Sequence, residues 1–408
     1  MMTNRREFIS TVLGSSAVVS LSGLAPDVFY QAALADEAKK DGRVLVVVQL
    51  SGGNDGLNTV VPYRHDVYRE NRKALRVSKD DVLTLDKEYG LHPAMDGFAK
   101  LFEKGLLGIV PSVGYDQPNR SHFESMDIWH TCRRKTDRLQ QGWLGQFLEA
   151  SNNGSQQLTG IHLGQGKQPL ALAARNLRIP SIASLEQFRL NTKGNKRLDA
   201  ILNQALQPRE KSEDLLGFLQ SSTRAAVAAN DRIQKIRESG GSTDDYPDTD
   251  LGKKMSTIAR LIKAELPTRV YYVTQNGYDT HAKQGGAHTS LLRQLSGAVT
   301  ALVDDMQASG IGNRVLVVAF SEFGRRVAEN ASEGTDHGTA GPLFLAGGKV
   351  KSGFLAPHSK LSDLNNGDLK FKTDFREVYA GLLQQWCRFA ETESILGGHY
   401  RPLSVVKA

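Results

Sequence analysis

Side chains that can bind a cation or attack an ester recur along this sequence, each close to the end of a predicted strand. They share a carboxylate, amide, hydroxyl or imidazole group: Asn54 and Asp55, Ser121, Asp279 and His281, Glu322, and Asp336 and His337. Carboxylates with a few imidazoles suit divalent cations such as Zn²⁺, Mn²⁺, Mg²⁺ or Ca²⁺. Because carboxylates in one cleft raise one another's pKa, a bound cation would balance their charge. The pattern predicts a divalent metal site, provided that the fold brings these positions together.

The stretch 314–348 must position much of this chemistry. Its apolar run Val315–Phe320 predicts a strand buried on both faces, at the centre of a parallel sheet. Glu322 follows, then a helix-like segment, a Gly-rich turn at 334–338 and a second apolar run at 342–346. In open α/β sheets, ligands bind beyond the carboxyl ends of the strands. We therefore expect the polar residues that follow this strand to face a ligand.

Three more apolar runs predict strands, and amphipathic segments predict helices between them. The strands are expected at Arg43–Leu50, Leu107–Val113 and Arg269–Thr274, and the helices at 93–106, 251–266, 291–306 and 375–389. Asp374 is the expected cap of the last helix. This alternation predicts an α/β fold, a three-layer αβα doubly wound architecture around a mainly parallel sheet.

Ser121 lies where a strand gives way to a helix, and two roles fit it. A hydroxyl there can use the helix N-terminus to stabilise an anionic adduct. Alternatively, Ser121 caps the helix and forms a capping box with Glu124, three residues further on. Both roles could belong to this one residue.

The first 35 residues have the order of an export signal. Arg5 and Arg6 precede an apolar, small-residue stretch at 11–25, and Ala33–Ala35 supplies a small-x-small cleavage pattern. We expect a twin-arginine signal at 1–35, the twin-arginine translocase as a partner, and a periplasmic or secreted mature chain at 36–408. The apolar stretch is too short for a permanent membrane span.

Residues 150–250 break the strand–helix alternation. Short strand-like pieces precede a polar helical segment at 214–237 and a linker-like run at 239–250. We expect an inserted mixed or helical segment on the main domain here.

Composition excludes some classes of protein. The 51 Lys and Arg against 44 Asp and Glu give a net charge of +7, but the basic residues are scattered, which disfavours a nucleic-acid partner. Cys132 and Cys387 have no second thiolate or imidazole at metal-ligand spacing, which disfavours a thiolate metal site. The sequence leaves two states open, a disulfide between them in an oxidising compartment and two buried free thiols, and we expect the free thiols.

Five segments carry a family resemblance: SGGNDGLN, PNRSHF, GYDTHAKQ, SEFGRR and GTDHG. With them the chain resembles the alkaline phosphatase/sulfatase superfamily and, more closely, the exported bacterial family called domain of unknown function 1501. The resemblance implies a doubly wound α/β sandwich and metal-assisted hydrolysis of phosphate or sulfate esters. The substrate would be a small-molecule or polymer ester.

The resemblance also implies roles for individual residues. Asp55, with Asn54 beside it, matches the metal-binding aspartate after the first strand, and Ser121 matches the nucleophile. Asp279 and His281 match the pair that holds one metal ion. In addition, Arg120 would neutralise an oxygen of the transferred group.

Glu322 stands where the strand-end aspartate of a second metal ion usually lies, and His337 matches the late histidine ligand. Two departures matter. Phe323 replaces an expected imidazole, and the Asp279-to-His281 spacing is two rather than four, so His288 is a possible substitute ligand. One metal ion is therefore expected more than two. Ser121 lacks the C/S-x-P-x-R context of sulfatases, which disfavours sulfate esters.

Two alternatives remain open from the sequence. The missing imidazole at Phe323 would suit a non-catalytic envelope protein that binds metal or polysaccharide. A metal-free serine esterase would use Ser121, His337 and Asp336, although the chain has no G-x-S-x-G elbow here.

Overall fold

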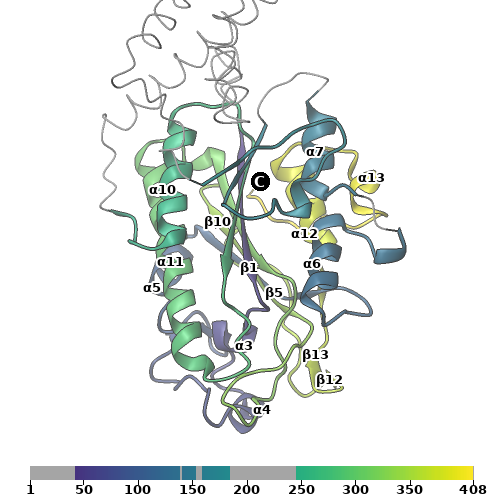
Figure 1. Cartoon of the computed structure of the whole chain (residues 1–408). Coiled ribbons are helices and arrows are strands. Elements are labelled where there is room, and N and C mark those ends of the chain that lie inside the picture. The colour runs from purple at the N-terminus through teal and green to yellow at the C-terminus, as the bar shows by residue number, and fades with distance from the viewer. Residues whose placement is uncertain (1–41, 138–139, 153–158, 184–244, 408) are drawn as a thin grey trace, which may run out of the picture.

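The computed structural model describes residues 42–137, 140–152, 159–183 and 245–407 (Figure 1). The expected export signal at 1–35 lies outside the described residues. So do residues 184–244, which make up most of the expected insertion.

A nine-stranded sheet runs through the middle of the described chain, in the order β11-β5-β10-β9-β1-β8-β6-β7, with β14 also paired to β5. All five strands that the apolar runs predict are present: β1 (Val44–Ser51), β5 (Leu107–Gly114), β8 (Val270–Asn276), β9 (Val315–Ser321) and β10 (Gly341–Gly347). The shorter strands are β6 (Gly160–Leu163), β7 (Ser181–Ile182), β11 (Gly353–Phe354) and β14 (Thr373–Asp374).

The sheet is mainly parallel, as predicted. β1 lies between β8 and β9 and is parallel to both, and β8 is parallel to β6. β10 is the exception, because it runs antiparallel to both β9 and β5. The loop before β10 therefore starts at the same edge where β9 ends, which places its polar residues near Glu322.

Helices cover both faces of the sheet, so the predicted three-layer architecture is confirmed (Figure 1). On one face, α5 (Asp96–Glu103), α10 (Asp250–Lys263) and α11 (Gln284–Ala308) pack against even-numbered β1 residues such as Val46 and Val48. On the other, α6 (His122–Thr131), α7 (Trp143–Ser151) and α12 (Phe375–Gly381) pack against Leu45 and Val47.

Small elements gather beyond the carboxyl ends of the strands (Figure 1). They are α3 (Gly56–Thr59), α4 (Asp66–Asn71), and the short strands β2 (Val60–Val61), β3 (Leu83–Thr84), β4 (Gly90–Leu91), β12 (Leu364–Asn365) and β13 (Asp368–Leu369). A separate apolar cluster that includes Val61 and Tyr68 holds this region together. These elements close off the end of the sheet where the candidate residues lie.

Two helix predictions are wrong in detail. No helix follows Glu322: residues 322–340 form turns and a single bridge between Arg325 and His337. The buried Arg325 side chain donates hydrogen bonds to the backbone oxygen of Gly53, in the loop after β1, and to that of Thr335 within the same segment, which holds this segment in an irregular path. The last helix is interrupted, since α12 ends at Gly381 and a π-helical turn, Leu382–Trp386, follows; α13 (Thr392–Leu396) is separate.

The expected cap of that last helix is confirmed. The Asp374 carboxylate accepts a hydrogen bond from the backbone N–H of Arg376, and the Glu377 carboxylate accepts one from the backbone N–H of Asp374, which completes a capping box. Cys132 and Cys387 are both buried and free. Among the described residues, no helix combines the length and the apolar character that a membrane crossing needs.

Candidate functional site

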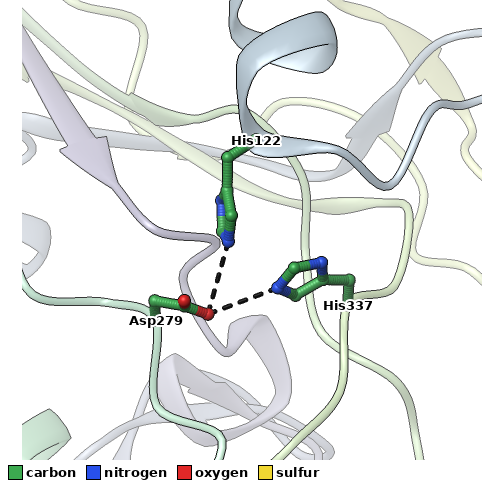
Figure 2. Close-up of side chains that lie close together, drawn as sticks. All are labelled: His122, Asp279 and His337. Carbon is green, nitrogen blue, oxygen red and sulfur yellow. Dashed lines mark hydrogen bonds and ion pairs between the residues drawn. The ribbon is translucent and has the colours of Figure 1, made fainter.

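His122, Asp279 and His337 converge from three separate segments at the carboxyl edge of the sheet (Figure 2). His122 is the first residue of α6, Asp279 follows β8, and His337 precedes β10. One ligand atom from each residue lies within 4.8 Å of the other two. Oδ1 of Asp279 lies 3.3 Å from Nε2 of His122 and 3.3 Å from Nε2 of His337. We call these three residues the metal cluster.

The tautomer of His337 leaves a lone pair facing the cluster. Its Nδ1 lies 2.8 Å from the backbone oxygen of Arg120, and a carbonyl oxygen can only accept a hydrogen bond. Nδ1 therefore carries the proton, and Nε2 of the neutral ring does not. Burial is the main cause that lowers the pKa of His337 and favours this neutral form. Nε2 is thus available to bind a cation.

His122 is oriented in the same way by a carboxylate. Its Nδ1 lies 2.8 Å from Oε1 of Glu322, which assigns the proton to Nδ1 and leaves Nε2 as the free nitrogen. That Nε2 is buried and forms no hydrogen bond with the described residues, although Asp279 is close. A carboxylate that fixes an imidazole in this way is typical of metal-binding histidines. The hydrogen bond that His122 donates to Glu322 also raises the pKa of His122, so an imidazolium between two carboxylates is the competing state.

Glu322 lies behind the cluster rather than in it. Its buried carboxylate accepts hydrogen bonds from the backbone N–H of Gly52 at 2.9 Å, from the hydroxyl of Ser321 at 2.9 Å and from His122. Sequence reasoning assigned Glu322 directly to a metal ion. In the structure it orients a histidine, because the Ser321-Glu322 backbone turns the carboxylate toward Gly52.

Arg325 fixes the position of Asp279. Its Nη2 donates a 2.7 Å hydrogen bond to Oδ1 of Asp279, and its remaining N–H groups bind backbone oxygens of Gly53, Thr335 and Tyr278. Burial would raise the pKa of Asp279, but the hydrogen bond and the charge of Arg325 outweigh burial, and the pKa is lowered to about 2. Asp279 is therefore a carboxylate at neutral pH, half exposed and aimed at the two imidazoles.

His281 adds a fourth group at the open side of the cluster. Its Nε2 lies 2.9 Å from Nε2 of His337 and 3.1 Å from Oδ1 of Asp279, and its Nδ1 lies 3.4 Å from Asp336. Two lone pairs at 2.9 Å would repel each other, so without a cation His281 must carry a proton on Nε2. Sequence reasoning assigned His281 directly to a metal ion, whereas the structure places it beside the three cluster residues.

Asp55 is not part of the cluster. Both of its oxygens bind the guanidinium of Arg72, at 2.5 and 3.0 Å, and Gln284 donates a further hydrogen bond. Both side chains of this ion pair are fully buried. Burial alone would raise the pKa of Asp55, but the charge and hydrogen bonds of Arg72 outweigh it and the pKa is lowered. The guanidinium supplies the positive charge that the resemblance assigned to a metal ion.

Asn54 is equally occupied. Its side-chain oxygen lies 3.0 Å from the hydroxyl of Thr59 and 3.0 Å from Nε2 of His288. His288, the possible substitute ligand, is therefore buried against Asn54 and does not reach the cluster residues. Together with the Arg72–Asp55 pair, this arrangement leaves one candidate metal position rather than two among the described residues.

Ser121 is exposed and stands at the N-cap position of α6, but its side chain forms no capping hydrogen bond. The expected capping box with Glu124 is absent, because the amide of Asn119 instead accepts from the Ser121 backbone at 2.8 Å. Both neighbours of Ser121 are connected to the cluster: His122 belongs to it, and the backbone oxygen of Arg120 accepts a hydrogen bond from His337. The Arg120 guanidinium pairs with Asp368.

The alternative Ser-His-Asp triad is not assembled. Asp336 lies 3.4 Å from His281 and 3.1 Å from Asn330, while both nitrogens of His337 face other groups. Sequence reasoning missed His122, although it belongs to the PNRSHF segment. The available signal was its position as the first residue of a helix at a strand-to-helix junction, one residue after the more conspicuous Ser121.

The fold and the cluster define a three-layer α/β protein with a candidate metal site at the carboxyl edge of its sheet. The chain belongs to the family described as protein of unknown function DUF1501, whose model matches residues 42–385. No curated protein matches the chain.

Solved structures with a similar fold include phosphatase-like and sulfatase-like proteins. The C-terminal periplasmic domain of EcEptC from Escherichia coli, in complex with Zn, shares 12% identity at a TM-score of 0.38, over 76% of this chain and 74% of that one. An alkaline phosphatase from the Antarctic bacterium TAB5 shares 10% sequence identity at a TM-score of 0.34, over 75% of this chain and 91% of that one. A 2-O GAG sulfatase, BT1596, shares 10% sequence identity at a TM-score of 0.33, over 89% of this chain and 76% of that one. Similarity this low assigns neither activity nor substrate to the present chain.

Proposed function

We propose that this protein is an exported hydrolase that uses one divalent metal ion, held by His122, Asp279 and His337, to cleave phosphate esters. The observation that carries the proposal is the pair of imidazoles whose Nδ1 protons are fixed by Glu322 and a backbone oxygen. Both Nε2 lone pairs then face one carboxylate oxygen, a repulsive arrangement that a cation between them would relieve. The residues present therefore fit a metal ion.

A divalent cation in such a site polarises an ester oxygen and lowers the pKa of a nearby hydroxyl or water. The chain's own residues supply the rest. Glu322 and Arg325 hold His122 and Asp279 in place, and the first N–H groups of α6 favour a negative charge beside Ser121.

Ser121 is the proposed nucleophile. Its oxygen forms a bond to phosphorus as the ester P–O bond breaks, its proton passes to water, and the leaving alkoxide takes a proton from water. A second water then hydrolyses the phosphoserine. Phe123, 87% exposed two residues further on, offers an apolar surface for an aromatic leaving group. Sulfate esters are less favoured, because Ser121 lacks the sulfatase context.

Export is the second part of the proposal. The arginine pair, the apolar stretch and the cleavage pattern within residues 1–35 support passage through the twin-arginine translocase to the periplasm or beyond. That pathway moves folded proteins, so a metal ion bound in the cytoplasm would travel with the chain.

The test combines metal analysis with hydrolysis of aryl phosphate mono- and diesters by the purified mature protein. Chelation should abolish hydrolysis, and Ser121→Ala should remove hydrolysis but keep the metal ion. His337→Ala should lose both, while His399→Ala, at an exposed histidine paired with Glu393, should lose neither. Glu322→Gln should weaken metal affinity about 10- to 100-fold. Unchanged hydrolysis after chelation, or in Ser121→Ala, would refute the mechanism.

A second candidate is a metal-binding envelope protein without turnover. This candidate is favoured by the ion pair between Arg120 and Asp368, because a guanidinium bound to Asp368 is not free to neutralise an oxygen of the transferred group. One bound metal ion per chain, with no hydrolysis of a broad ester panel, would support this candidate against the first.

A further inference from the structure

A polar cavity of about 290 Å³ lies along the sheet and shares no lining residue with the metal cluster. Its floor consists of the last residues of two neighbouring strands, Gln49 and Ser51 of β1 and Thr274 and Asn276 of β8. These residues are paired across the sheet, Gln49 with Thr274 and Ser51 with Asn276. The cavity therefore lies at the carboxyl ends of parallel strands, where open α/β sheets bind ligands.

The sequence of the two strands explains why a cavity forms there. On this face, the first halves of the strands contribute apolar side chains such as Leu45, Val47 and Val270 to the core under α6 and α7. The second halves change to amide and hydroxyl side chains, which do not continue that apolar packing. The change leaves a pocket of hydrogen-bonding groups instead of more core.

Two buried histidines line the cavity. His130, on α6, is 5% exposed, and its Nε2 lies 3.1 Å from the side-chain oxygen of Gln49. His162, on β6, is 4% exposed, and its Nδ1 lies 2.9 Å from the hydroxyl of Ser181. A Cβ on Gly164 would lie 2.8 Å from Nε2 of His162, so the glycine keeps that edge of the ring uncovered.

The charge at the cavity is positive. Lys167 and Lys254 line it, and none of the described lining residues is Asp or Glu. Lys254 forms an ion pair with Asp250 at 2.6 Å, but its side chain is only 16% exposed and Asp250 lies outside the lining. Clefts lined by charges of one sign concentrate ligands of the opposite sign.

We infer that this cavity binds a small hydroxyl-rich anion, of the chemical class of a sugar acid. The amide, hydroxyl and imidazole groups match sugar hydroxyls, and the two lysines match one carboxylate. Leu163 and Pro169 are the main apolar side chains in the lining, so an apolar ligand would be poorly matched. The volume is about ten times the share of one water molecule in the liquid, which is room for a monosaccharide. The site requires neither the metal ion nor hydrolysis.

Isothermal titration of the full mature protein with D-glucuronate, D-glucose and inorganic phosphate tests the inference. We expect binding of glucuronate and at least about tenfold weaker binding of glucose, because only the acid pairs with lysine. Lys254→Met should weaken glucuronate binding about tenfold or more, and Lys254→Arg should recover part of it. The matched control is Lys253→Met, whose lysine is exposed and pairs with Asp248.

Two more variants separate the cavity from the metal cluster. Gly164→Leu should abolish glucuronate binding by covering the His162 edge, with circular dichroism to check folding. Asp279→Asn changes the metal cluster and not the cavity, so it should leave glucuronate binding unchanged. The cavity inference and the proposed hydrolysis can therefore fail independently of each other. No binding of glucuronate, equal binding of glucose, binding of phosphate alone, or an unchanged affinity in Lys254→Met would each overturn the inference.

Discussion

Replacing Arg72 by methionine tests whether an arginine, rather than a metal ion, balances the charge of Asp55. Both side chains are fully buried, and Arg72 supplies two of the three side-chain hydrogen bonds that Asp55 accepts. Breaking a buried ion pair by removing one partner costs about 3–5 kcal/mol of unfolding free energy. We expect a loss in this range at pH 7, measured by urea denaturation.

The pH dependence of this loss has a definite sign. In the native protein the pKa of Asp55 lies below its ordinary value, so the stability that the ion pair contributes is present above about pH 4 and is lost as the pH falls through the lowered pKa. In Arg72→Met, burial without the guanidinium raises that pKa, and protonation relieves the buried charge. The difference between native and variant protein should therefore be smaller at pH 4.5 than at pH 7, by about 1.4 kcal/mol for each unit by which the pKa of Asp55 in the variant exceeds 4.5, up to pH 7.

Two controls make the result decisive. Arg69→Met removes an exposed arginine of α4, the helix that ends one residue before Arg72; Arg69 is paired with Asp66, and its loss should cost less than about 1 kcal/mol. Arg72→Met combined with Asp55→Asn should cost less than the sum of the single changes, by about 1–3 kcal/mol. An equal loss at both pH values, or a loss of the same size when the native protein is chelated, would refute the assignment and return Asp55 to a metal ion.

Three further predictions concern the scaffold. Gly286→Ala should raise the unfolding free energy by about 0.5–1 kcal/mol, because this glycine is exposed in the first turns of α11 with open space around it. Gly324→Ala should lower the unfolding free energy by about 1–3 kcal/mol, because its Cβ would lie 2.0 Å from the Ala340 backbone oxygen. Thermal denaturation of both variants would detect the opposite signs. Asp374→Ala should cost about 1–2 kcal/mol by removing the capping box of α12, and an unchanged denaturation midpoint would contradict that. Burial lowers the pKa of His130 to about 3 and of His358 to about 4, so the unfolded chain binds more protons than the folded one below about pH 6.5, and stability should fall as the pH drops from there towards 4; a stability that is constant over this window, measured by urea denaturation, would show that these histidines are not held neutral.

The sequence was sufficient to predict the strands and the edge of the sheet at which the site lies. Uninterrupted apolar runs such as Val315–Phe320 have one simple explanation, a strand buried on both faces, and β9 confirms it. A polar residue that directly follows such a run must then lie at the carboxyl edge of the sheet, where the strand ends. This is why the sequence predicts that Asp279 and His337 lie near each other.

Partners that come from distant loops could not be predicted in this way. Arg72 and Arg325 look like ordinary surface charges in the sequence, yet their side chains are fully buried. Their pairing with Asp55 and Asp279 depends on how loops cross beyond the sheet, which apolar periodicity does not encode. His122 was missed for a related reason, because its function follows from the carboxylate of Glu322, 200 residues away along the chain.

The Arg325 side chain links the loops around the site to one another. It holds the loops after β1 and β8 and the loop before β10 by their backbone oxygens, at Gly53, Tyr278 and Thr335. These three loops should therefore open as one cooperative unit. Amide hydrogen exchange would then show a common opening free energy for all three, so the loops would lose or regain their order together rather than one at a time.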